Sequence, residues 1–422
     1  MVQSWIPVSD DSDFSLQNLP YGIFSTAEHD RRIGVAIGDQ VLDLKALRQS
    51  QVFSGLGFDT STLLEPTLNL YAGQGRNVHR KVRALLQELL QSQTSLGHVL
   101  RDNQELKQKA LVPSENVEMH LPMSIGDYTD FFTSPYHAQN CTDLVRPGQK
   151  LPPGFFKLPI GYGGRSSSIV VSGTPVRRPR GQFVVDNNHT FGPSQKLDFE
   201  VEFAAFVGQG NEHGTAIDVN DAEEHIFGLV LLNDWSARDI QRAEAGALGP
   251  LNGKNFCTSI SPWIVTLDAL EPYRTNTLTT IRLQPYLEGK NDSVHDIPVD
   301  AYIQVGSDKY HFSQCNTKYT CFSFGQMLAH HTAGGCPMRP GDLFGTGTLS
   351  GPQESELGCF LEGSRDGTQP RVMKAVGSSS ETITRAWLED GDIVHFTARQ
   401  KCQDGPGFVG FGSCSGQVIR SG

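Results

Sequence analysis

The sequence predicts a mainly β protein with some helix, in which a small N-terminal β module precedes a larger mixed β-roll or barrel-like domain. Glycine (44 residues) and proline (23 residues) are frequent, while charged residues make up only 19% of the chain. This balance is typical of many turns and short strands. Apolar or alternating segments recur along the chain, and a length of 422 residues gives room for one large domain or two to three ordinary ones.

Residues 1–118 form the predicted N-terminal module. Three of its segments have the composition of short strands: 21–25, 32–37 and 40–44. Gly38-Asp39 separates the second from the third and predicts a hairpin turn. We therefore expect a meander or a small barrel.

A helical pattern follows in the same module. Apolar residues recur at helical spacing from Val78 to Leu90 and less regularly as far as Leu111, which predicts one or two amphipathic helices that end near Pro113. Their leucines are expected in the core. Residues 111–117 are expected to form a linker.

Residues 119–422 form the predicted larger domain, where glycines and clustered polar residues separate strand-like segments. The predicted strands are 168–171, 197–207, 226–232, 263–267, 302–305, 342–347 and 392–398. Two short helices interrupt them, at 236–244 and 323–331, the second capped by Gly334-Gly335.

Charge and composition exclude several classes of protein. A formal charge of −11 and a pI near 5.6 disfavour nucleic acid or an anionic membrane as a partner. The first ten residues lack the basic and apolar regions of a signal peptide, and no window approaches the ~18 apolar residues of a membrane span. The eight cysteines include no C-x-x-C pair, which favours reduced thiols and a cytoplasmic location.

The stretch from Leu197 to Phe203 organises the functional interpretation. Side chains alternate along a strand, so Asp198, Glu200 and Glu202 are expected in a row on one face, with apolar partners on the other. Three like charges need compensation, and carboxylate oxygens favour Ca²⁺ or Mg²⁺ over zinc or copper. The alternative is a solvated edge strand whose charges prevent aggregation.

Two further segments carry candidate site residues. Gly126 opens a segment with two acids three apart, Asp127 and Asp130, followed by His137, so that carboxylate ligands and a base could share one pocket. A packed or surface histidine is the structural alternative.

The segment 233–242 begins where an apolar strand ends. Asp234 is a candidate fourth carboxylate, and Arg238 and Gln241 share one helical face, where they could donate to a developing oxyanion. An ordinary helix start capped by Ser236 is the alternative.

Two more segments complete the set. Lys254 lies in a glycine-rich loop that lacks the phosphate-loop pattern, since Asn255 follows the lysine, so it is interpreted as a positive charge near a ligand. Glu362 is a candidate carboxylate partner for His137, because a carboxylate that orients a histidine strengthens it as a base. His330-His331 is interpreted as structural, since adjacent helical residues face apart.

In combination these motifs resemble the fumarylacetoacetate hydrolase family. The resemblance extends from Ile6-Pro7-Val8 to the 408–412 tail, through the segments 126–131, 165–173, 197–206, 233–241, 258–263 and 339–351. It implies an SH3-like N-terminal barrel, a β-roll catalytic domain and a homodimer. It also implies the hydrolysis of a 1,3-diketo acid, namely 4-fumarylacetoacetate to fumarate and acetoacetate, the last step of tyrosine and phenylalanine catabolism.

The resemblance assigns roles position by position. Calcium ligands are implied at Asp130, Glu200, Glu202 and Asp234, and a neighbouring magnesium site at Asp234, Lys254 and Thr258. His137 matches the base and Glu362 its partner, while Arg238, Gln241 and Lys254 match the groups that stabilise the oxyanion. Substrate contacts are implied at Arg146, Tyr162 and Thr348 and, where the family usually has tyrosine, at Phe132.

Three departures from the family pattern bear on the substrate. Phe132 replaces the tyrosine, Gly163 replaces a histidine, and Ala245 replaces an aromatic residue. Loss of hydrogen-bonding groups can change selectivity by orders of magnitude. A paralogue that acts on another diketo acid, or that runs decarboxylation or tautomerisation, is therefore the alternative function, and a non-catalytic metal-binding protein is a third hypothesis that the intact His137 and Glu362 disfavour.

Overall fold

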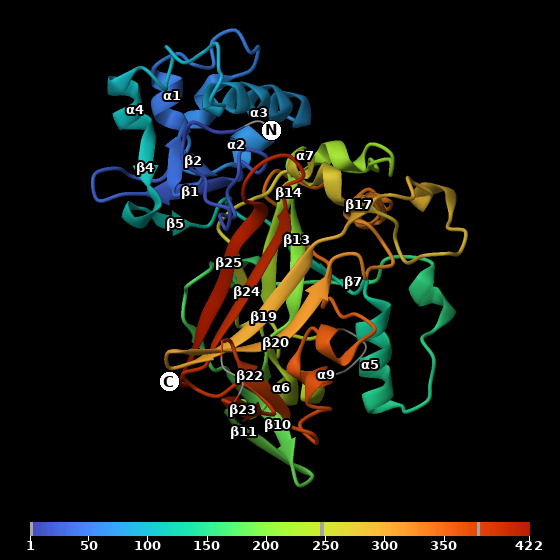
Figure 1. The fold of residues 1–422 in the computed structure, drawn as a ribbon. Coiled ribbons are helices and arrows are strands. Elements are labelled where there is room, and N and C mark those ends of the chain that lie inside the picture. Colours follow the sequence, from blue (N-terminus) through green and yellow to red (C-terminus); the bar gives the residue numbers. More distant parts are fainter. Residues whose placement is uncertain (1–2, 245–248, 378–379) are drawn as a thin grey trace.

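The computed structural model describes residues 3–244, 249–377 and 380–422, and strands dominate it (Figure 1). The N-terminal module lies at the top of Figure 1 in blue and teal, and the long strands of the larger domain run below it. The predicted mainly β class with some helix is confirmed. All eight cysteines are free thiols. Within the described ranges, no helix combines the length and the apolar character needed to cross a bilayer.

The N-terminal module contains a five-stranded antiparallel sheet in the order β4-β3-β2-β1-β5. Its strands are β1 (Tyr21–Ser25), β2 (Arg32–Ile37), β3 (Gln40–Asp43), β4 (Leu111–Pro113) and β5 (Glu118–His120). Its helices are α1 (Leu44–Gln49), α2 (Asn69–Ala72), α3 (Arg76–Leu90) and α4 (Gln104–Ala110). This small sheet is consistent with the SH3-like barrel that the resemblance implied.

The predicted hairpin is present, and it ends one residue earlier than expected. The Asp43 carboxylate accepts hydrogen bonds from the backbone N–H groups of Lys45 and Ala46, so Asp43 caps α1 and ends β3. The predicted helix is also confirmed, and Val82 and Leu86 are buried on the inner face of α3.

The expected linker at 111–117 is wrong. Residues 111–113 form β4, which pairs with β3, and a 3-10 turn at Ser114–Asn116 follows. β5 then pairs with β1. The segment is therefore part of the N-terminal sheet, whose pairing no local pattern of the sequence revealed.

Two seven-stranded sheets make up most of the chain that follows the N-terminal module, and this part is here called the catalytic domain after the role that the resemblance implied. The first has the order β7 (Gly161–Gly163), β6 (Tyr128–Phe131), β21 (Leu343–Gly345), β13 (Val201–Val207), β14 (Ile226–Asp234), β16 (Thr258–Ile260) and β8 (Ile169–Val171). The second has the order β23 (Thr382–Arg385), β22 (Arg371–Ala375), β20 (Asp308–Asn316), β19 (Pro298–Val305), β24 (Ile393–Lys401), β25 (Phe408–Ile419) and β9 (Val176–Arg177).

Smaller elements surround these sheets. Three two-stranded sheets pair β10 (Arg180–Val185) with β11 (Asn188–Pro193), β12 (Leu197–Asp198) with β15 (Ser236–Ala237), and β17 (Arg274–Thr275) with β18 (Val294–His295). The helices are α5 (Pro135–Val145), α6 (Arg238–Glu244), α7 (Leu267–Leu270), α8 (Phe324–Thr332) and α9 (Phe360–Gly363).

The first sheet is buried on both faces. Phe203 and Ala205 of β13 belong to the core that also contains the apolar residues of the second sheet. The alternating residues Ala204 and Phe206 belong to the core of the N-terminal module. This double burial explains why β13 and β14 are nearly continuous apolar runs.

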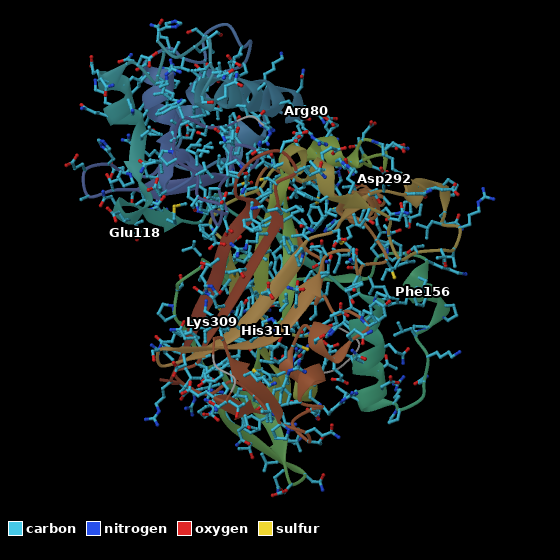
Figure 2. The ribbon with its side chains drawn as sticks, viewed as in Figure 1. Arg80, Glu118, Phe156, Asp292, Lys309 and His311 are labelled. Atoms are coloured by element: carbon cyan, nitrogen blue, oxygen red, sulfur yellow. The ribbon has the colours of Figure 1, made fainter. Side chains whose placement is uncertain are left out.

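Ion pairs also join the two modules. Arg80 of α3, labelled at the junction in Figure 2, contacts Asp268 of α7, with Nε 2.9 Å from Oδ1. Arg76, which is buried, contacts the same carboxylate at 3.0 Å.

Most of the predicted catalytic-domain strands and both predicted helices are present, with three differences. The segment 197–207 is broken into β12 and β13. The segment 263–267 makes only isolated bridges, Tyr21 to Ile264 and Leu229 to Val265, before α7 begins. Helices α5, α7 and α9 were not predicted, and α5 and α9 carry His137 and Glu362.

Candidate active site and metal centre

Four buried carboxylates meet at one end of the first sheet. Asp130 lies on β6, Glu202 on β13 and Asp234 at the end of β14, while Glu200 directly precedes β13. Each offers an oxygen atom, and these four atoms all lie within 4.8 Å of one another. The structure therefore brings together the four residues that the sequence proposed as calcium ligands.

A glycine makes room between two of these carboxylates. β21 lies between β6 and β13, and its Gly345 is opposite Asp130 in one pairing and Ala204 in the other. A Cβ atom on Gly345 would stand 3.1 Å from both Asp130 Oδ1 and Glu202 Oε2. The absence of a side chain at this position keeps the space between the two carboxylates open.

Two cations partly balance the four acids. The Lys254 ammonium contacts Glu200 and lies 2.6 Å from Asp234 Oδ2, and Arg238 Nη1 lies 2.7 Å from Glu200 Oε1. Burial alone would raise the pKa of Glu200, because it disfavours the charged carboxylate. The positive charges of Lys254 and Arg238 outweigh this effect and hold the pKa of Glu200 below its ordinary range.

The other three carboxylates remain undercompensated. Burial, and next to it the neighbouring acids, raise the pKa values of Asp130, Glu202 and Asp234 above their ordinary range. Asp130 Oδ1 and both oxygens of Glu202 are buried without a hydrogen-bond partner. Buried oxygens without donors, in an all-oxygen set, fit a hard divalent cation such as Ca²⁺ or Mg²⁺.

Lys254 and Thr258 adjoin the same site at Asp234. Thr258 Oγ1 donates to Asp234 Oδ1 at 3.4 Å, and β16 places it directly opposite that residue. Asp234 and Glu200 raise the pKa of Lys254 despite its burial, and an ammonium group has no lone pair. Lys254 therefore supplies charge at this position in the structure.

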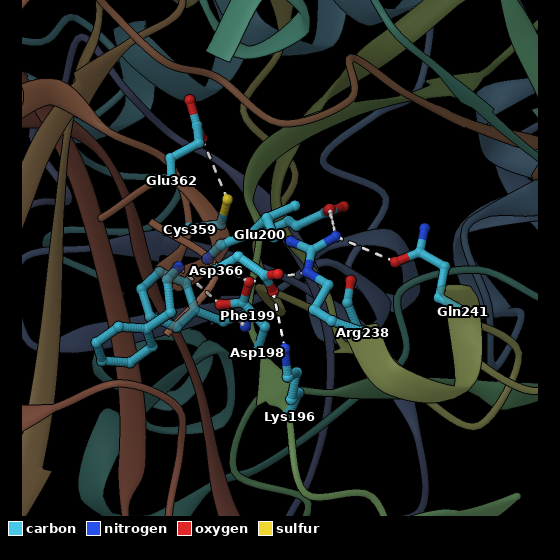
Figure 3. Close-up of polar contacts among 12 residues, drawn as sticks. Lys196, Asp198, Phe199, Glu200, Arg238, Gln241, Cys359, Glu362 and Asp366 are labelled. Carbon is cyan, nitrogen blue, oxygen red and sulfur yellow. Dashed lines mark hydrogen bonds and ion pairs between the residues drawn. The ribbon is translucent and has the colours of Figure 1, made fainter. Parts of the chain in front are cut away.

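Asp198 does not join the carboxylate row that alternation predicted. The chain leaves β12 after Asp198, and Asp198 instead accepts from Arg238 Nε at 2.8 Å and from the backbone N–H groups of Phe360 and Leu361 (Figure 3). The break between β12 and β13 separates it from Glu202. The charge of Asp198 is therefore balanced by the guanidinium of Arg238, and not by the metal ion that the sequence predicted.

His137 and Glu362 form a buried pair. His137 lies in the first turn of α5, Glu362 lies on α9, and His137 Nδ1 is 2.8 Å from Glu362 Oε2. Glu362 also accepts from Asn140 Nδ2 at 2.7 Å and from Ser350 Oγ at 2.8 Å. The predicted dyad is thus present, with both carboxylate oxygens occupied by donors.

The pair is strongly polarised. Burial favours neutral Glu362, but the facing His137 and the hydrogen-bond donors outweigh burial and lower the pKa of Glu362 to about 2. Burial likewise opposes a charge on His137, but Cys141 and Glu362 raise its pKa well above the ordinary value. A histidine held in this way is a strong base with a fixed orientation.

Arg238 and Gln241 meet as the helical spacing predicted. Arg238 Nη1 donates to Gln241 Oε1 at 3.3 Å, and Figure 3 shows Gln241 beside the guanidinium. Arg238 Nη2 is buried with no hydrogen-bond partner, so one donor stays available for an oxyanion.

The proposed substrate contacts have varied surroundings. Tyr162 Oη donates to Asp234 Oδ2 at 3.2 Å, and Thr348 is buried in the segment after β21. Phe132 packs edge-on against His137, with ring centroids 5.3 Å apart. Arg146 is exposed at the C-terminal end of α5.

Two further positions depart from the family pattern, Gly163 and Ala245, and the structure describes only the first of them. A Cβ atom on Gly163 would meet nothing within 4 Å, so this position of β7 faces open space. Ala245 lies outside the described residues.

Four side chains around the dyad were not predicted from the sequence: Asn140, Cys141, Ser350 and Cys359. Two of them had a usable signal. Ser134-Pro135 is a helix start, with Ser134 as N-cap and proline at the first position, and the helix it begins places Asn140 and Cys141 on the face of His137.

Comparison with known proteins follows the same division of the chain. A family model described as fumarylacetoacetase N-terminal matches residues 17–122, and one described as fumarylacetoacetate (FAA) hydrolase C-terminal matches residues 128–419. A fumarylacetoacetase of Oryza sativa subsp. japonica is 47% identical over 99% of this chain and 97% of its own length. Fumarylacetoacetases of Arabidopsis thaliana (46%; 100% of this chain and 99% of that protein) and Homo sapiens (44%; 99% and 98%) match similarly.

A more distant solved structure shares the fold. The fumarylacetoacetate hydrolase of psychrophilic Exiguobacterium antarcticum is 16% identical, with a TM-score of 0.51, covering 95% of this chain and 99% of that one. At this identity the likeness concerns the fold alone.

Proposed function

Because this chain belongs to the fumarylacetoacetate hydrolase family, we propose that it hydrolyses the carbon–carbon bond of fumarylacetoacetate to give fumarate and acetoacetate. The observation that carries the proposal is the placement of the His137–Glu362 pair with a free Arg238 donor and four metal-type carboxylates in one buried region. The full-length fumarylacetoacetase relatives support the choice of substrate.

His137 is the proposed base. Glu362 fixes the imidazole through Nδ1, which leaves Nε2 to take a proton from water as the water oxygen adds to the substrate carbonyl. When the carbon–carbon bond breaks, its electron pair leaves with the acetoacetate fragment, which then takes up a proton. Phe132 covers one side of the imidazole and keeps bulk water from that side.

Arg238 is the proposed oxyanion partner. Its Nε and Nη1 are fixed by Asp198 and Glu200, so the guanidinium is immobile and its unpartnered Nη2 can meet charge that develops on the carbonyl oxygen. We assign the amide of Gln241 and the ammonium of Lys254 to the same task.

We propose Ca²⁺ or Mg²⁺ as the cofactor. Asp130, Glu200, Glu202 and Asp234 would hold the ion, with Thr258 and Lys254 beside Asp234. Such an ion polarises a diketone carbonyl and stabilises the enolate that leaves.

The direct experiment uses the purified protein with Ca²⁺ or Mg²⁺ and fumarylacetoacetate. A fall in diketone absorbance, with fumarate and acetoacetate identified as products, is the expected result. Folded protein that shows no turnover would refute the proposed substrate. Release of carbon dioxide or formation of an isomer would instead support the alternative, a paralogue with altered chemistry, which the open position at Gly163 and the apolar Phe132 favour.

We also propose that the protein is a cytoplasmic homodimer. The eight free thiols support a reducing compartment. Val184 and Phe191 are 51% and 64% exposed on one face of the hairpin β10–β11, which projects from the catalytic domain in Figure 1, and this supports an interface. Light scattering of the eluted protein gives the mass that tests the dimer.

A further inference from the structure

Glu362 Oε2 is the meeting point of a second set of ligand-type groups. His137 Nδ1 lies 2.8 Å from this oxygen and Cys359 Sγ lies 3.1 Å from it. Figure 3 shows the Cys359 sulfur directed at the Glu362 carboxylate, away from Asp198. All three residues are buried, and each offers one ligand atom within 4.8 Å of the other two.

We propose that His137, Cys359 and Glu362 form a binding site for Zn²⁺ or a similar borderline cation, separate from the carboxylate cluster. Thiolate and imidazole ligands favour such ions, whereas the all-oxygen cluster around Asp130 favours Ca²⁺ and Mg²⁺. One nitrogen, one sulfur and one oxygen ligand leave a fourth tetrahedral position for water.

The spacing of the three groups is close to that of a coordinated ion. Zinc–ligand bonds of about 2.0–2.3 Å in tetrahedral geometry place neighbouring ligand atoms about 3.4–3.6 Å apart. The present separations of 2.8 and 3.1 Å therefore need to widen by roughly half an ångström. The ion would take the place of the protons that now link the nitrogen and the sulfur to Oε2.

The surrounding residues would hold the ligands in this orientation. Asn140 Nδ2 donates to Glu362 Oε1 at 2.7 Å, which turns Oε2 toward the other two groups. Cys141 Sγ lies 3.5 Å from His137 Nε2 and 3.9 Å from His137 Nδ1, so it packs against the imidazole beside both nitrogens. Contacts of this kind restrict the orientation of ligating side chains.

A surface pocket reaches Glu362, one of the three proposed ligands. Tyr136 and Asn140 of α5, Glu354, Glu362 and Arg365 are among its lining residues. A cation can thus approach the Glu362 carboxylate from the side of the pocket, without passing the carboxylate cluster.

Occupation of this site would prevent His137 from acting as a base. The ion would engage the imidazole and neutralise Glu362, so Zn²⁺ would inhibit the enzyme even when Ca²⁺ saturates the other site. This consequence rests on the proposed function, but binding itself does not, and the two are tested by separate measurements.

The test uses Co²⁺ as a spectroscopic substitute for Zn²⁺ on the full chain with Ca²⁺ in excess. We expect a cobalt–thiolate charge-transfer band that Zn²⁺ removes, and one equivalent of Zn²⁺ taken from a chromophoric chelator. Wild-type protein without such a band, or without zinc uptake, would overturn the proposal whatever its activity.

Variants assign the thiolate. Cys359→Ser keeps a hydroxyl donor near Glu362 and should lose the band, with zinc affinity at least about a hundredfold weaker. Cys336→Ser, at an exposed cysteine, is the matched control and should retain both. A band that survives in Cys359→Ser but disappears in Cys141→Ser would overturn the assignment. Circular dichroism confirms the fold of each variant, and the wild-type spectrum remains decisive if Cys359→Ser is unstable.

Discussion

Glu362 controls how strongly His137 holds its proton. The carboxylate is buried and accepts hydrogen bonds from His137, Asn140, Ser350 and Cys359, so its negative charge is stable beside the imidazole. The base and its orientation therefore depend on one charge that the solvent does not screen.

Glu362→Gln is expected to reduce kcat by about 10²–10⁴-fold, the range for loss of general base catalysis. Removing the negative charge lowers the pKa of His137, because Glu362 now raises it. Activity needs the neutral imidazole, so the acidic limb of the pH profile of kcat/KM should move to lower pH. Initial rates between pH 5 and 9 measure both effects.

Glu354→Gln is the control for this change. Glu354 lines the same surface pocket as Glu362, but its carboxylate is 70% exposed and pairs with Arg365. Removal of the Glu354 charge should leave the acidic limb of the kcat/KM profile at the same pH. An equal shift in both variants would show that the position of the acidic limb depends on the overall negative charge near the pocket and not on the His137–Glu362 pair.

Gly345→Ala is expected to weaken Ca²⁺ binding by roughly fivefold to 150-fold, since an overpacking cost of about 1–3 kcal/mol corresponds to those factors. The added methyl would stand 3.1 Å from Asp130 Oδ1 and from Glu202 Oε2 and push the carboxylates apart. Isothermal titration with Ca²⁺ measures the affinity.

Gly334→Ala is the matched control, because its Cβ would meet nothing within 4 Å. Neither glycine has a positive φ, so a difference between the variants reports crowding and not backbone strain. Unchanged affinity in Gly345→Ala would contradict a metal between these carboxylates.

At this scale the sequence predicted residue types better than partners. Hard-ligand chemistry was visible in Glu200 and Glu202, and alternation then wrongly added Asp198. The error is physical: a two-residue strand ends at Asp198, and Arg238 from a distant helix compensates it. Asp130 and Asp234 were candidates from their own segments, but only the family resemblance assigned them to the same ion as Glu200 and Glu202, because sequence spacing carries no contact information.

Helix α5 is the element that carries the base. Ser134 Oγ accepts from His137 N at 3.4 Å and donates to Ser350 O at 3.1 Å. The cap therefore joins the first turn of α5 to the segment after β21, from which Ser350 reaches Glu362.

Ser134→Ala is expected to destabilise the protein by about 0.5–2 kcal/mol, the usual cost of a lost cap, and also to lower kcat, because the turn that holds His137 loses its anchor. Chemical denaturation gives the first quantity and initial rates give the second.

Ser323→Ala provides the comparison. Ser323 caps α8 with a full capping box, and α8 carries no proposed catalytic group. It should cost similar stability and leave kcat unchanged. If both variants lowered kcat equally, the cap of α5 would have no specific role in placing His137.

Elements were predictable where one local pattern sufficed. The turn at Gly38-Asp39 and the periodic leucines of α3 needed no distant partner, and both were found. α9 has only four residues, too few for a periodic pattern, and β4 is a strand only because β3 lies beside it. Short elements held by distant neighbours leave little local signal.

The fold buries four carboxylates in a region where the protein's own cations do not balance all of their negative charge. Asp130, Glu200, Glu202 and Asp234 are all buried where they meet beside β6, β13 and β14. Lys254 and the shared Arg238 balance only part of their charge. Folding of the metal-free protein should therefore depend on protons at this site.

The sign of that dependence follows from the pKa shifts. Burial and the neighbouring acids raise the pKa values of Asp130, Glu202 and Asp234 in the folded protein, whereas unfolded carboxyls titrate near their ordinary values of about 4. Between these limits the folded state holds more protons than the unfolded state. The free energy of unfolding in EDTA should thus fall as pH rises from about 4 through the raised values.

Calcium should reverse this trend, because it binds the deprotonated carboxylates and competes with their protons. Its stabilisation, about 2.7 kcal/mol at a hundredfold excess over Kd, should be largest where protons compete least. We expect the difference in Tm between Ca²⁺ and EDTA to grow from pH 5.5 to pH 8, measured by scanning calorimetry. Asp130→Asn should reduce this difference, while Asp366→Asn, which removes a carboxylate paired with Lys196 outside the cluster, should retain it. A difference that stays constant or shrinks with pH would mean that these carboxylates do not bind the ion.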